Sequence, residues 1–239
     1  MLNWLFAVIV YPIVYFFLPT KIVGKKFLKS AKKQPAIYSA NHQSNNDPII
    51  IKYRVNWFAR FMGKVDLFKK KIVGGFFKKI GVYPVNRGGN DIESVKYTLK
   101  LLKNKKNIVI FPEGTRVKEG ESQEYKNGLV FFALKTDCLV VPMVFRKKPR
   151  FFRFNKLVIG EPFRFSQIPE FQGIGKPDKE KLNQASTYLT EKMKYLKEVD
   201  IKEYKKEVKQ KLKEKRTVSW LLFFFSHFIF IIRISCFIN

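Results

Sequence analysis

The chain has 239 residues, which is enough to bury a substantial core, and is most simply one domain with appendages. Its apolar content of 46% and aromatic content of 16% exclude an intrinsically disordered protein. Lys and Arg number 47 against 19 Asp and Glu, and the net charge of +28 predicts an anionic partner: nucleic acid, an acidic membrane surface or a phosphorylated substrate.

The first element is an apolar run over residues 1–18. As a helix it would be about 27 Å long, close to the ~30 Å hydrocarbon core of a bilayer. A signal peptide is disfavoured because the run lacks a basic leader and a small-residue cleavage site. We therefore predict a membrane-anchoring segment over 1–20, which either spans the bilayer or lies in its interface. The lysines that follow place the body on the cytoplasmic side of a cell membrane.

Residues 21–198 alternate between strand-like and helix-like segments. This alternation predicts an α/β layer fold. Predicted helices begin at Ile49 and after a capping box formed by Asn90 and Glu93. The further segments are strands over 35–39, 81–85, 107–111, 138–145 and 157–159, and helices over 128–135 and 182–196.

The last 41 residues differ in character from this domain. Residues 199–217 predict a basic amphipathic helix, which is either a solvated surface helix or an interfacial helix on anionic lipid. Residues 218–239 form an apolar membrane-associated tail that is long enough to span a bilayer. Arg233 near its end could extend its charge to the interface.

The stretch from Asn41 to Asp47 carries the most specific chemistry. Of the two histidines, His227 lies in the apolar tail, so His42 is the imidazole available for proton transfer near neutral pH. On a helix, Asp47 would lie about 140° around from His42, so the two can meet only across a loop. The intervening Gln-Ser-Asn-Asn has loop composition. The alternative is a plain turn in which Asp47 caps a helix that begins at Pro48.

Three polar clusters follow apolar strands: His42 with Asp47, then Arg87, then Glu113 with Arg116. In open α/β sheets ligands bind at the carboxyl ends of the strands, so we expect these clusters to share one rim. His42 could take a proton from a hydroxyl, with Asp47 fixing its tautomer. The arginines and Lys64 could hold a phosphate.

Other chemistries are poorly supported by the sequence. No serine lies in a G-x-S-x-G elbow, and no phosphate-binding loop or dinucleotide fingerprint is present. Cys138 is the first residue of an apolar strand, and we expect both Cys138 and Cys236 to be buried thiols. A transition-metal site is improbable because there is one polar histidine and no cysteine cluster. A base without a nucleophilic side chain indicates direct transfer, in which a substrate alcohol attacks an activated acyl group.

Five blocks over residues 21–165 resemble the glycerolipid acyltransferases, in particular the bacterial 1-acyl-glycerol-3-phosphate acyltransferases. The N-H-x-S-x-x-D block is similar to residues 41–47, and the F-P-E-G-T-R block matches 111–116 in full. The other three are similar to residues 81–87, to the Val-Val-Pro-Met at 140–143, and to a lysine-bearing segment at 61–68. The first apolar segment is shorter than the family's two-helix membrane platform, and the tail at 218–238 is an addition.

This resemblance implies a mixed, largely parallel α/β sheet flanked by helices, with an N-terminal membrane helix. It implies His42 and Asp47 as the catalytic pair. The residues implied to bind the substrate, with Glu113 supporting the acceptor, are Lys64, Arg87, Glu113, Gly114, Thr115 and Arg116. It implies no cofactor and no metal, because the acyl donor is a substrate, carried on acyl carrier protein or coenzyme A.

Our hypothesis is transfer of an acyl chain to the 2-hydroxyl of 1-acyl-glycerol-3-phosphate, which makes phosphatidic acid for phospholipid synthesis. The same chemistry on glycerol-3-phosphate or a lysophospholipid is the alternative. A more remote alternative is a non-enzymatic basic protein that binds anionic lipid or nucleic acid. The aromatic residues concentrate in apolar runs and are not interleaved on a basic face, so anionic membrane lipids are expected as partners and nucleic acid is not.

Overall fold

The computed structural model describes residues 12–217 apart from 33, 87–90, 118–124, 174–176 and 216. The chain divides into two compact units between Glu198 and Val199. The first unit contains the sheet and its helices. In the second, residues 201–215 are helical.

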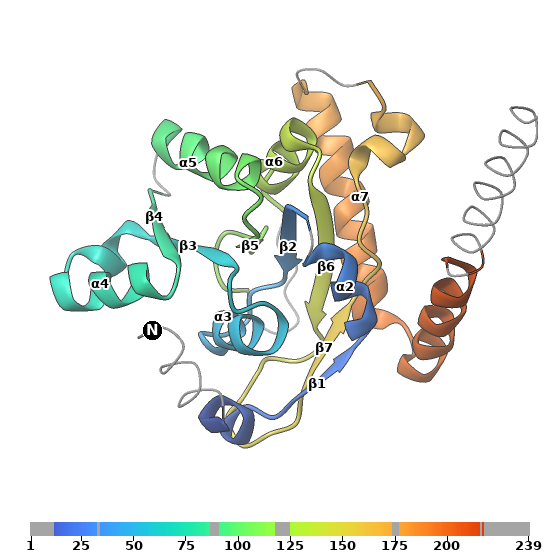
Figure 1. Cartoon of the computed structure of the whole chain (residues 1–239), viewed down its shortest axis with the longest axis horizontal. Coiled ribbons are helices and arrows are strands. Elements are labelled where there is room, and N and C mark those ends of the chain that lie inside the picture. Colours follow the sequence, from blue (N-terminus) through green and yellow to red (C-terminus); the bar gives the residue numbers. More distant parts are fainter. Residues whose placement is uncertain are drawn as a thin grey trace, which may run out of the picture. The chain divides into compact units, whose positions relative to one another are not determined.

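Within the described residues, seven strands form one sheet in the order β1-β7-β6-β2-β5-β3-β4 (Figure 1). Neighbouring strands are parallel except for β6 and β7, so β7 and β1 run opposite to the other five. The predicted mixed, largely parallel α/β fold is therefore confirmed. The strands are β1 (Thr20–Val23), β2 (Ala36–Ala40), β3 (Arg60–Lys64), β4 (Val82–Val85), β5 (Ile108–Ile110), β6 (Leu139–Phe145) and β7 (Asn155–Ile159).

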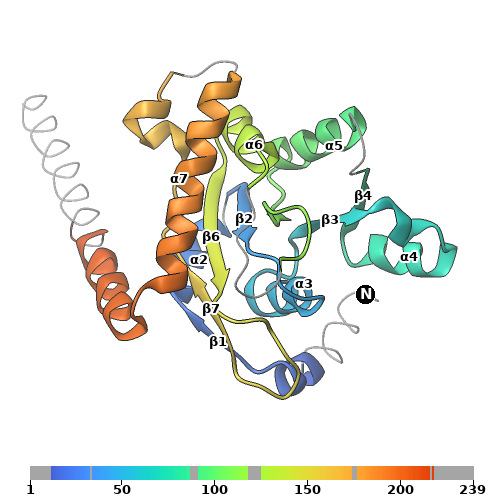
Figure 2. The same cartoon turned by 180° about the vertical axis from the view of Figure 1, so that it is seen from behind.

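Helices cover both faces of this sheet. One face carries α7, which packs along β6 and β7, with α6 beside it (Figure 2). The other carries α2 and α3 (Figure 1). The described helices are α2 (Leu28–Ala31), α3 (Asn46–Ile50), α4 (Lys71–Lys79), α5 (Ile92–Lys103), α6 (Gly128–Thr136) and α7 (Lys179–Glu198). Residues 12–17 are also helical, and residues 51–55 extend α3 as a wider π-helical turn.

The core lies around the two central strands. Every residue of β2 and of β6 is buried. Both strands are almost wholly apolar, which is expected of parallel strands that are covered on both faces. Asn107, just before β5, accepts a hydrogen bond from the Ala36 backbone N–H and aligns the start of β2.

Most predicted elements are confirmed, and the errors are local. Five predicted strands correspond to β2, β4, β5, β6 and β7 within one or two residues, whereas β1, β3 and α4 were not predicted. Helix α3 begins at Asn46, so the alternative of Asp47 as the cap of a helix starting at Pro48 is wrong. Asp91 caps α5 by accepting from the Ser94 N–H, where the sequence indicated Asn90 as the cap.

None of the described helices is long and apolar enough to cross a membrane. The predicted anchoring segment over 1–20 falls largely outside the described residues. The predicted apolar tail over 218–239 lies entirely outside them. Both stay predictions.

Candidate active site

The carboxyl end of β2 leads directly into the loop that carries His42. Nδ1 of His42 lies 2.9 Å from Oδ2 of Asp47. The His42 side chain is 15% exposed and that of Asp47 is fully buried. The loop therefore brings the two residues together as the sequence predicts. With Nδ1 engaged by the carboxylate, Nε2 is the nitrogen left for a substrate.

The loop is shaped by the carboxylate of Asp47. Oδ2 also accepts the backbone N–H groups of Gln43 and Ser44, at 2.6 and 2.7 Å, and Oδ1 accepts the Ser44 hydroxyl at 3.0 Å. Asp47 lies in the first turn of α3, where the helix dipole also favours a negative charge. Four donors thus converge on one buried carboxylate, which fixes its position opposite the imidazole.

Two residues outside the predicted set hold the loop in place. The side-chain amide of Asn41 donates to the Phe145 carbonyl and accepts the Phe145 N–H, so it extends the pairing of β2 with β6 by one side chain. The ring of Phe111, at the end of β5, stacks on the His42 imidazole with centroids 4.2 Å apart. The ring plane of His42 is thereby set by Asp47 at its edge and Phe111 on its face.

The segment after β5 lies against this loop. The Val117 N–H donates to the His42 carbonyl at 2.9 Å, and the Arg116 guanidinium donates to the side-chain oxygen of Asn45 at 3.0 Å. Gly114 has a φ of +73° that suits glycine, and a Cβ at this position would lie only 3.0 Å from the Lys126 side chain. The structure therefore brings Gly114, Thr115 and Arg116 to the loop that carries His42.

Glu113 is buried beside His42. The backbone N–H groups of His42 and of Glu113 itself donate to its carboxylate. Burial, chiefly, raises the pKa of Glu113 to about 7, and the nearby Asp47 charge adds to this effect. Among the described residues Oε2 of Glu113 has no hydrogen-bond partner. Glu113 is therefore both a support of the His42 backbone and a carboxyl group with an unused oxygen.

Lys64 and Arg87, the two remaining predicted phosphate ligands, differ in outcome. Lys64 ends β3 and is exposed, and its ammonium lies 2.5 Å from Asp66. Asp66 also binds Lys69, and these hydrogen bonds, that of Lys64 first, lower the pKa of Asp66 to about 2. The ammonium of Lys64 is thus already paired with the carboxylate of Asp66. Arg87 lies outside the described residues.

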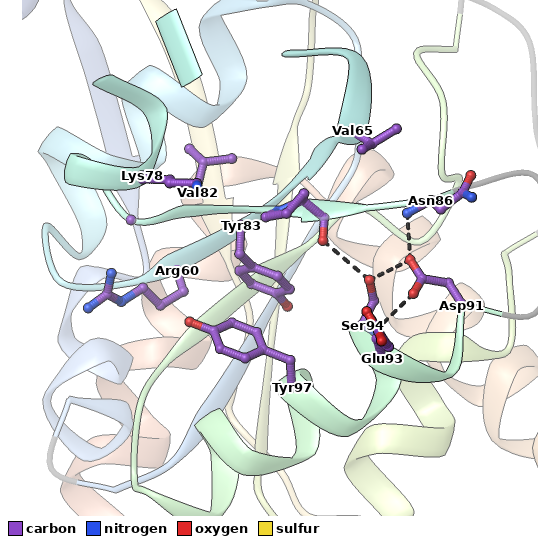
Figure 3. Close-up of a pocket in the computed structure, with 12 residues that line it drawn as sticks. Arg60, Val65, Lys78, Val82, Tyr83, Asn86, Asp91, Glu93, Ser94 and Tyr97 are labelled. Carbon is purple, nitrogen blue, oxygen red and sulfur yellow. Dashed lines mark hydrogen bonds between the residues drawn. The ribbon is translucent and has the colours of Figure 1, made fainter. Parts of the chain in front are cut away.

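A separate pocket of about 780 Å³ lies at the β4 edge of the sheet (Figure 3). The tilted pair Tyr83 and Tyr97 lines it, and Arg60 and Lys78 bring positive charge. Asp91 at its rim is engaged by Ser94 and by the Asn86 N–H, as the dashed lines in Figure 3 show. Neither His42 nor Asp47 lines this pocket, so it is not the reaction centre.

Comparison with known proteins assigns the chain to a family. The acyltransferase family model matches residues 20–146, which is more than half of the chain. Over 152 residues the chain is 32% identical to the 1-acyl-sn-glycerol-3-phosphate acyltransferase of Bacillus subtilis, covering 62% of this chain and 71% of that protein.

Two further similarities concern a plant relative and a solved structure. The chain is 33% identical over 132 residues to the chloroplastic 1-acyl-sn-glycerol-3-phosphate acyltransferase LPAT1 of Arabidopsis thaliana, covering 54% of this chain and 36% of that protein. It thus spans little more than a third of the length of that plant relative. The crystal structure of the 1-acyl-sn-glycerophosphate acyltransferase PlsC from Thermotoga maritima has the same fold, with a TM-score of 0.60, 22% identity and coverage of 82% of this chain and 77% of that one. From the match over residues 20–146 and the similarity to the Bacillus protein, the chain belongs to the acyltransferase family.

Proposed function

We propose that the protein transfers an acyl chain from an acyl thioester to the 2-hydroxyl of 1-acyl-glycerol-3-phosphate, and so makes phosphatidic acid. The observation that carries this proposal is the hydrogen bond between the buried Asp47 and the partly exposed His42 at the carboxyl edge of the sheet. The names of the Bacillus and Arabidopsis relatives support the choice of acceptor.

The proposed reaction needs one base and no covalent enzyme intermediate. Nε2 of His42 takes the proton of the acceptor hydroxyl as its oxygen attacks the thioester carbonyl carbon. Asp47 stabilises the imidazolium that forms, because its carboxylate lies 2.9 Å from Nδ1. When the carbon–sulfur bond breaks, the imidazolium returns the proton to the leaving thiolate. The products, an ester and a free thiol, therefore contain the same atoms as the reactants, an alcohol and a thioester.

The acceptor phosphate is proposed to bind beside the His42 loop, with Arg116 as its first ligand. Arg116 is oriented by Asn45 and could bind a phosphate with two parallel hydrogen bonds. Lys64 ends β3, and Arg87 comes after the neighbouring strand β4 in the sequence. A phosphate would compete with Asp66 for Lys64. Glu113 has an oxygen without a partner among the described residues, and this oxygen could bind a second polar group of the acceptor.

Donor, partners and location follow from the same proposal. Acyl carrier protein and coenzyme A are both anionic, and a chain of net charge +28 suits either. No cofactor is required, because the thioester supplies the activated acyl group. The acceptor is a membrane lipid, so we place the protein at the cell membrane with its acyltransferase unit on the cytoplasmic side. The segment over residues 1–20 is then its membrane anchor.

The first test is the variant His42→Ala, assayed on vesicles that contain 1-acyl-glycerol-3-phosphate with each thioester donor in turn. Without its base the variant should lose at least ~100-fold in kcat, while circular dichroism and vesicle binding stay as in the wild type. Turnover like that of the wild type would exclude the mechanism. If the wild type transfers the acyl chain faster to glycerol-3-phosphate or to a lysophospholipid, the proposed acceptor is wrong and the proposed chemistry stands.

The second test concerns the phosphate. Arg116→Ala should raise the KM for the phosphorylated acceptor about tenfold or more, because a charge-assisted hydrogen bond contributes ~1.5–3 kcal/mol. The KM for the thioester donor should change less. If neither KM nor kcat for the acceptor changes, Arg116 does not belong to the phosphate site.

A further inference from the structure

The loop between β6 and β7 has an unusual composition that the proposed chemistry does not use. The loop and the first two residues of β7, residues 146–156, read RKKPRFFRFNK, with six Lys or Arg, three Phe and no Asp or Glu. This stretch is an exception to the prediction that aromatic residues are not interleaved with basic ones. Aromatic side chains set among basic ones, without an acidic residue to neutralise them, are typical of segments that contact the interface of an anionic bilayer.

The loop presents its rings outward. Phe151, Phe152 and Phe154 are 53%, 68% and 91% exposed, and beside them Phe16 of the N-terminal helix is 69% exposed. The Phe152 N–H donates to the Phe17 carbonyl at 2.7 Å, and the two rings pack edge to face. The loop and the end of the N-terminal helix therefore form one surface, which we call the aromatic-basic face. Its members are Phe16, Lys147, Lys148, Arg150, Phe151, Phe152, Arg153 and Phe154.

The shape of the loop is fixed by specific hydrogen bonds. Asn155 is buried, and its side chain accepts the Arg150 N–H and donates to the Arg150 carbonyl, which closes the tip. Phe152 has a φ of +55°, a left-handed conformation that is strained for a bulky side chain. A strained residue persists only where its surroundings enforce it. Here the hydrogen bonds of the loop hold the apolar ring of Phe152 in contact with water.

A pocket of about 720 Å³ opens on the same surface. Tyr15, Phe16 and Phe154 line its apolar side, and Lys21 and Lys156 its basic side. Arg54 also lines the pocket: its guanidinium lies 4.6 Å from the Tyr15 ring and donates to the Thr20 carbonyl. An apolar wall beside cations matches the junction between a lipid phosphate and its acyl chains.

The aromatic-basic face is connected to the site. The Asn46 side chain donates to the Pro149 carbonyl of the loop at 3.3 Å, and the Asn46 N–H donates to the Ser44 hydroxyl, which binds Asp47. A chain of hydrogen bonds thus runs from the loop to the carboxylate opposite His42.

We propose that the aromatic-basic face docks on an anionic phospholipid bilayer, with its phenylalanines in the interface and its basic residues on the lipid phosphates. The docking itself stands apart from the proposed function; only its purpose, to present lipid to His42, rests on it. The positive charge of the face argues against two other occupants, a second copy of the chain and its own apolar tail. A second copy meeting the same face would oppose Lys147, Lys148 and Arg150 to themselves. The apolar segment 218–238 contains no Asp or Glu to complement them.

The first experiment measures whether the loop enters lipid in the full-length chain. Phe154→Cys, in a Cys236→Ser background, is labelled with an environment-sensitive fluorophore; Cys138 is buried and should not react. On vesicles of phosphatidylcholine with phosphatidylglycerol, the emission should shift to the blue and be quenched by nitroxide-labelled lipid. The matched control is Ile92→Cys, which is exposed at the start of α5, next to the edge strand β4 and thus across the sheet from β6 and β7, and should stay in water.

Two results would overturn the proposal. In the first, the label at position 154 stays accessible to aqueous iodide while the protein is bound to vesicles. In the second, the label is already buried in protein without lipid, which would assign the face to a second copy or to another part of the chain.

The second experiment removes charge from the loop. The quadruple variant K147Q/K148Q/R150Q/R153Q is compared with K96Q/K100Q/K103Q/K106Q, which removes the same charge from exposed positions on and just after α5. The loop variant should lower the docked fraction of the label at least fivefold, since each basic residue near an anionic surface contributes about fivefold. The α5 variant should leave it unchanged. Equal effects of the two variants would overturn the proposal.

Acyl transfer provides a separate readout. With 1-acyl-glycerol-3-phosphate in neutral detergent micelles, the loop variant should match the wild type within about twofold, whereas on anionic vesicles its rate should fall at least fivefold. An equal loss in both media would overturn docking as the role of the loop. If the wild type transfers no acyl group in either medium, the proposed function fails, and the label at position 154 still decides the docking.

Discussion

Asp47→Asn tests the role of the carboxylate with almost no change in shape. The asparagine oxygen can take the place of Oδ2 and accept from His42 and from the Gln43 and Ser44 N–H groups. Its NH2 group then faces the Ser44 hydroxyl, which can accept a hydrogen bond. The substitution therefore keeps the geometry of the loop and removes the negative charge.

The expected loss follows from the position of that charge. Two unit charges about 4 Å apart attract by ~4 kcal/mol at an effective dielectric constant of ~20. The Asp47 side chain is fully buried, so solvent screens it little. The imidazolium formed in the transition state loses this attraction in the variant, while the neutral ring of the ground state does not. Because ~1.4 kcal/mol corresponds to a factor of ten, kcat should fall by about 10²–10³.

The assay is thiol release from the acyl donor in the presence of saturating 1-acyl-glycerol-3-phosphate. The KM values should stay within about threefold of the wild type, because the lost interaction belongs to the transition state. Ser44→Ala serves as the control, since it removes one hydrogen bond to Asp47 and keeps the charge. A kcat within tenfold of the wild type for Asp47→Asn, alongside an inactive His42→Ala, would refute the electrostatic role of Asp47.

Two further predictions concern the support of the site. Because burial raises the pKa of Glu113 to about 7, the folded state favours its protonated form. The stability that this carboxyl contributes is complete below pH ~4.5 and is lost as the pH rises through ~7, a change of ~3 kcal/mol. Glu113→Gln should flatten the pH dependence of unfolding between pH 5 and 8, and an unchanged slope in thermal melts would contradict this. Asn41→Leu leaves the N–H and C=O of Phe145 unpaired, so chemical denaturation should show a loss of ~2–4 kcal/mol; a loss below ~1 kcal/mol would contradict the pairing.

The sequence predicts the parts of the fold in which strands are buried on both faces. β2 and β6 are continuous apolar runs, and their character does not depend on a partner. β1 is different: it has four residues, Lys21 within it is exposed, and it is a strand only because it pairs with β7, more than 130 residues away in the sequence. β3 mixes buried Phe61 and Gly63 with more exposed Arg60 and Lys64. Short edge or mixed strands carry too little local signal to be recognised without their neighbours.

The site was predictable to the extent that its residues are close in the sequence. The composition between His42 and Asp47 indicated a loop, and the structure joins the two side chains. The contacts that aim the imidazole come from distant segments: Phe111 stacks on it, and Phe145 anchors Asn41 across 104 positions. The spacing of residues in the sequence does not predict those contacts. The pairing of Lys64 with Asp66 was missed for the opposite reason, since opposite charges two positions apart in the sequence are common and indicate little alone.

The strand order explains why the proposed membrane face lies beside the proposed base. β2 and β6 are parallel neighbours, so the loops that follow them, residues 41–45 and 146–154, must leave the sheet side by side. β1 runs the other way, so its first residue, and the helix that precedes it, come to the same edge. Three segments far apart in the sequence therefore meet at one rim by topology alone. A lipid acceptor bound at that rim could reach His42 while its acyl chain stays in the bilayer, and no step of the proposed transfer then requires the lipid to enter water.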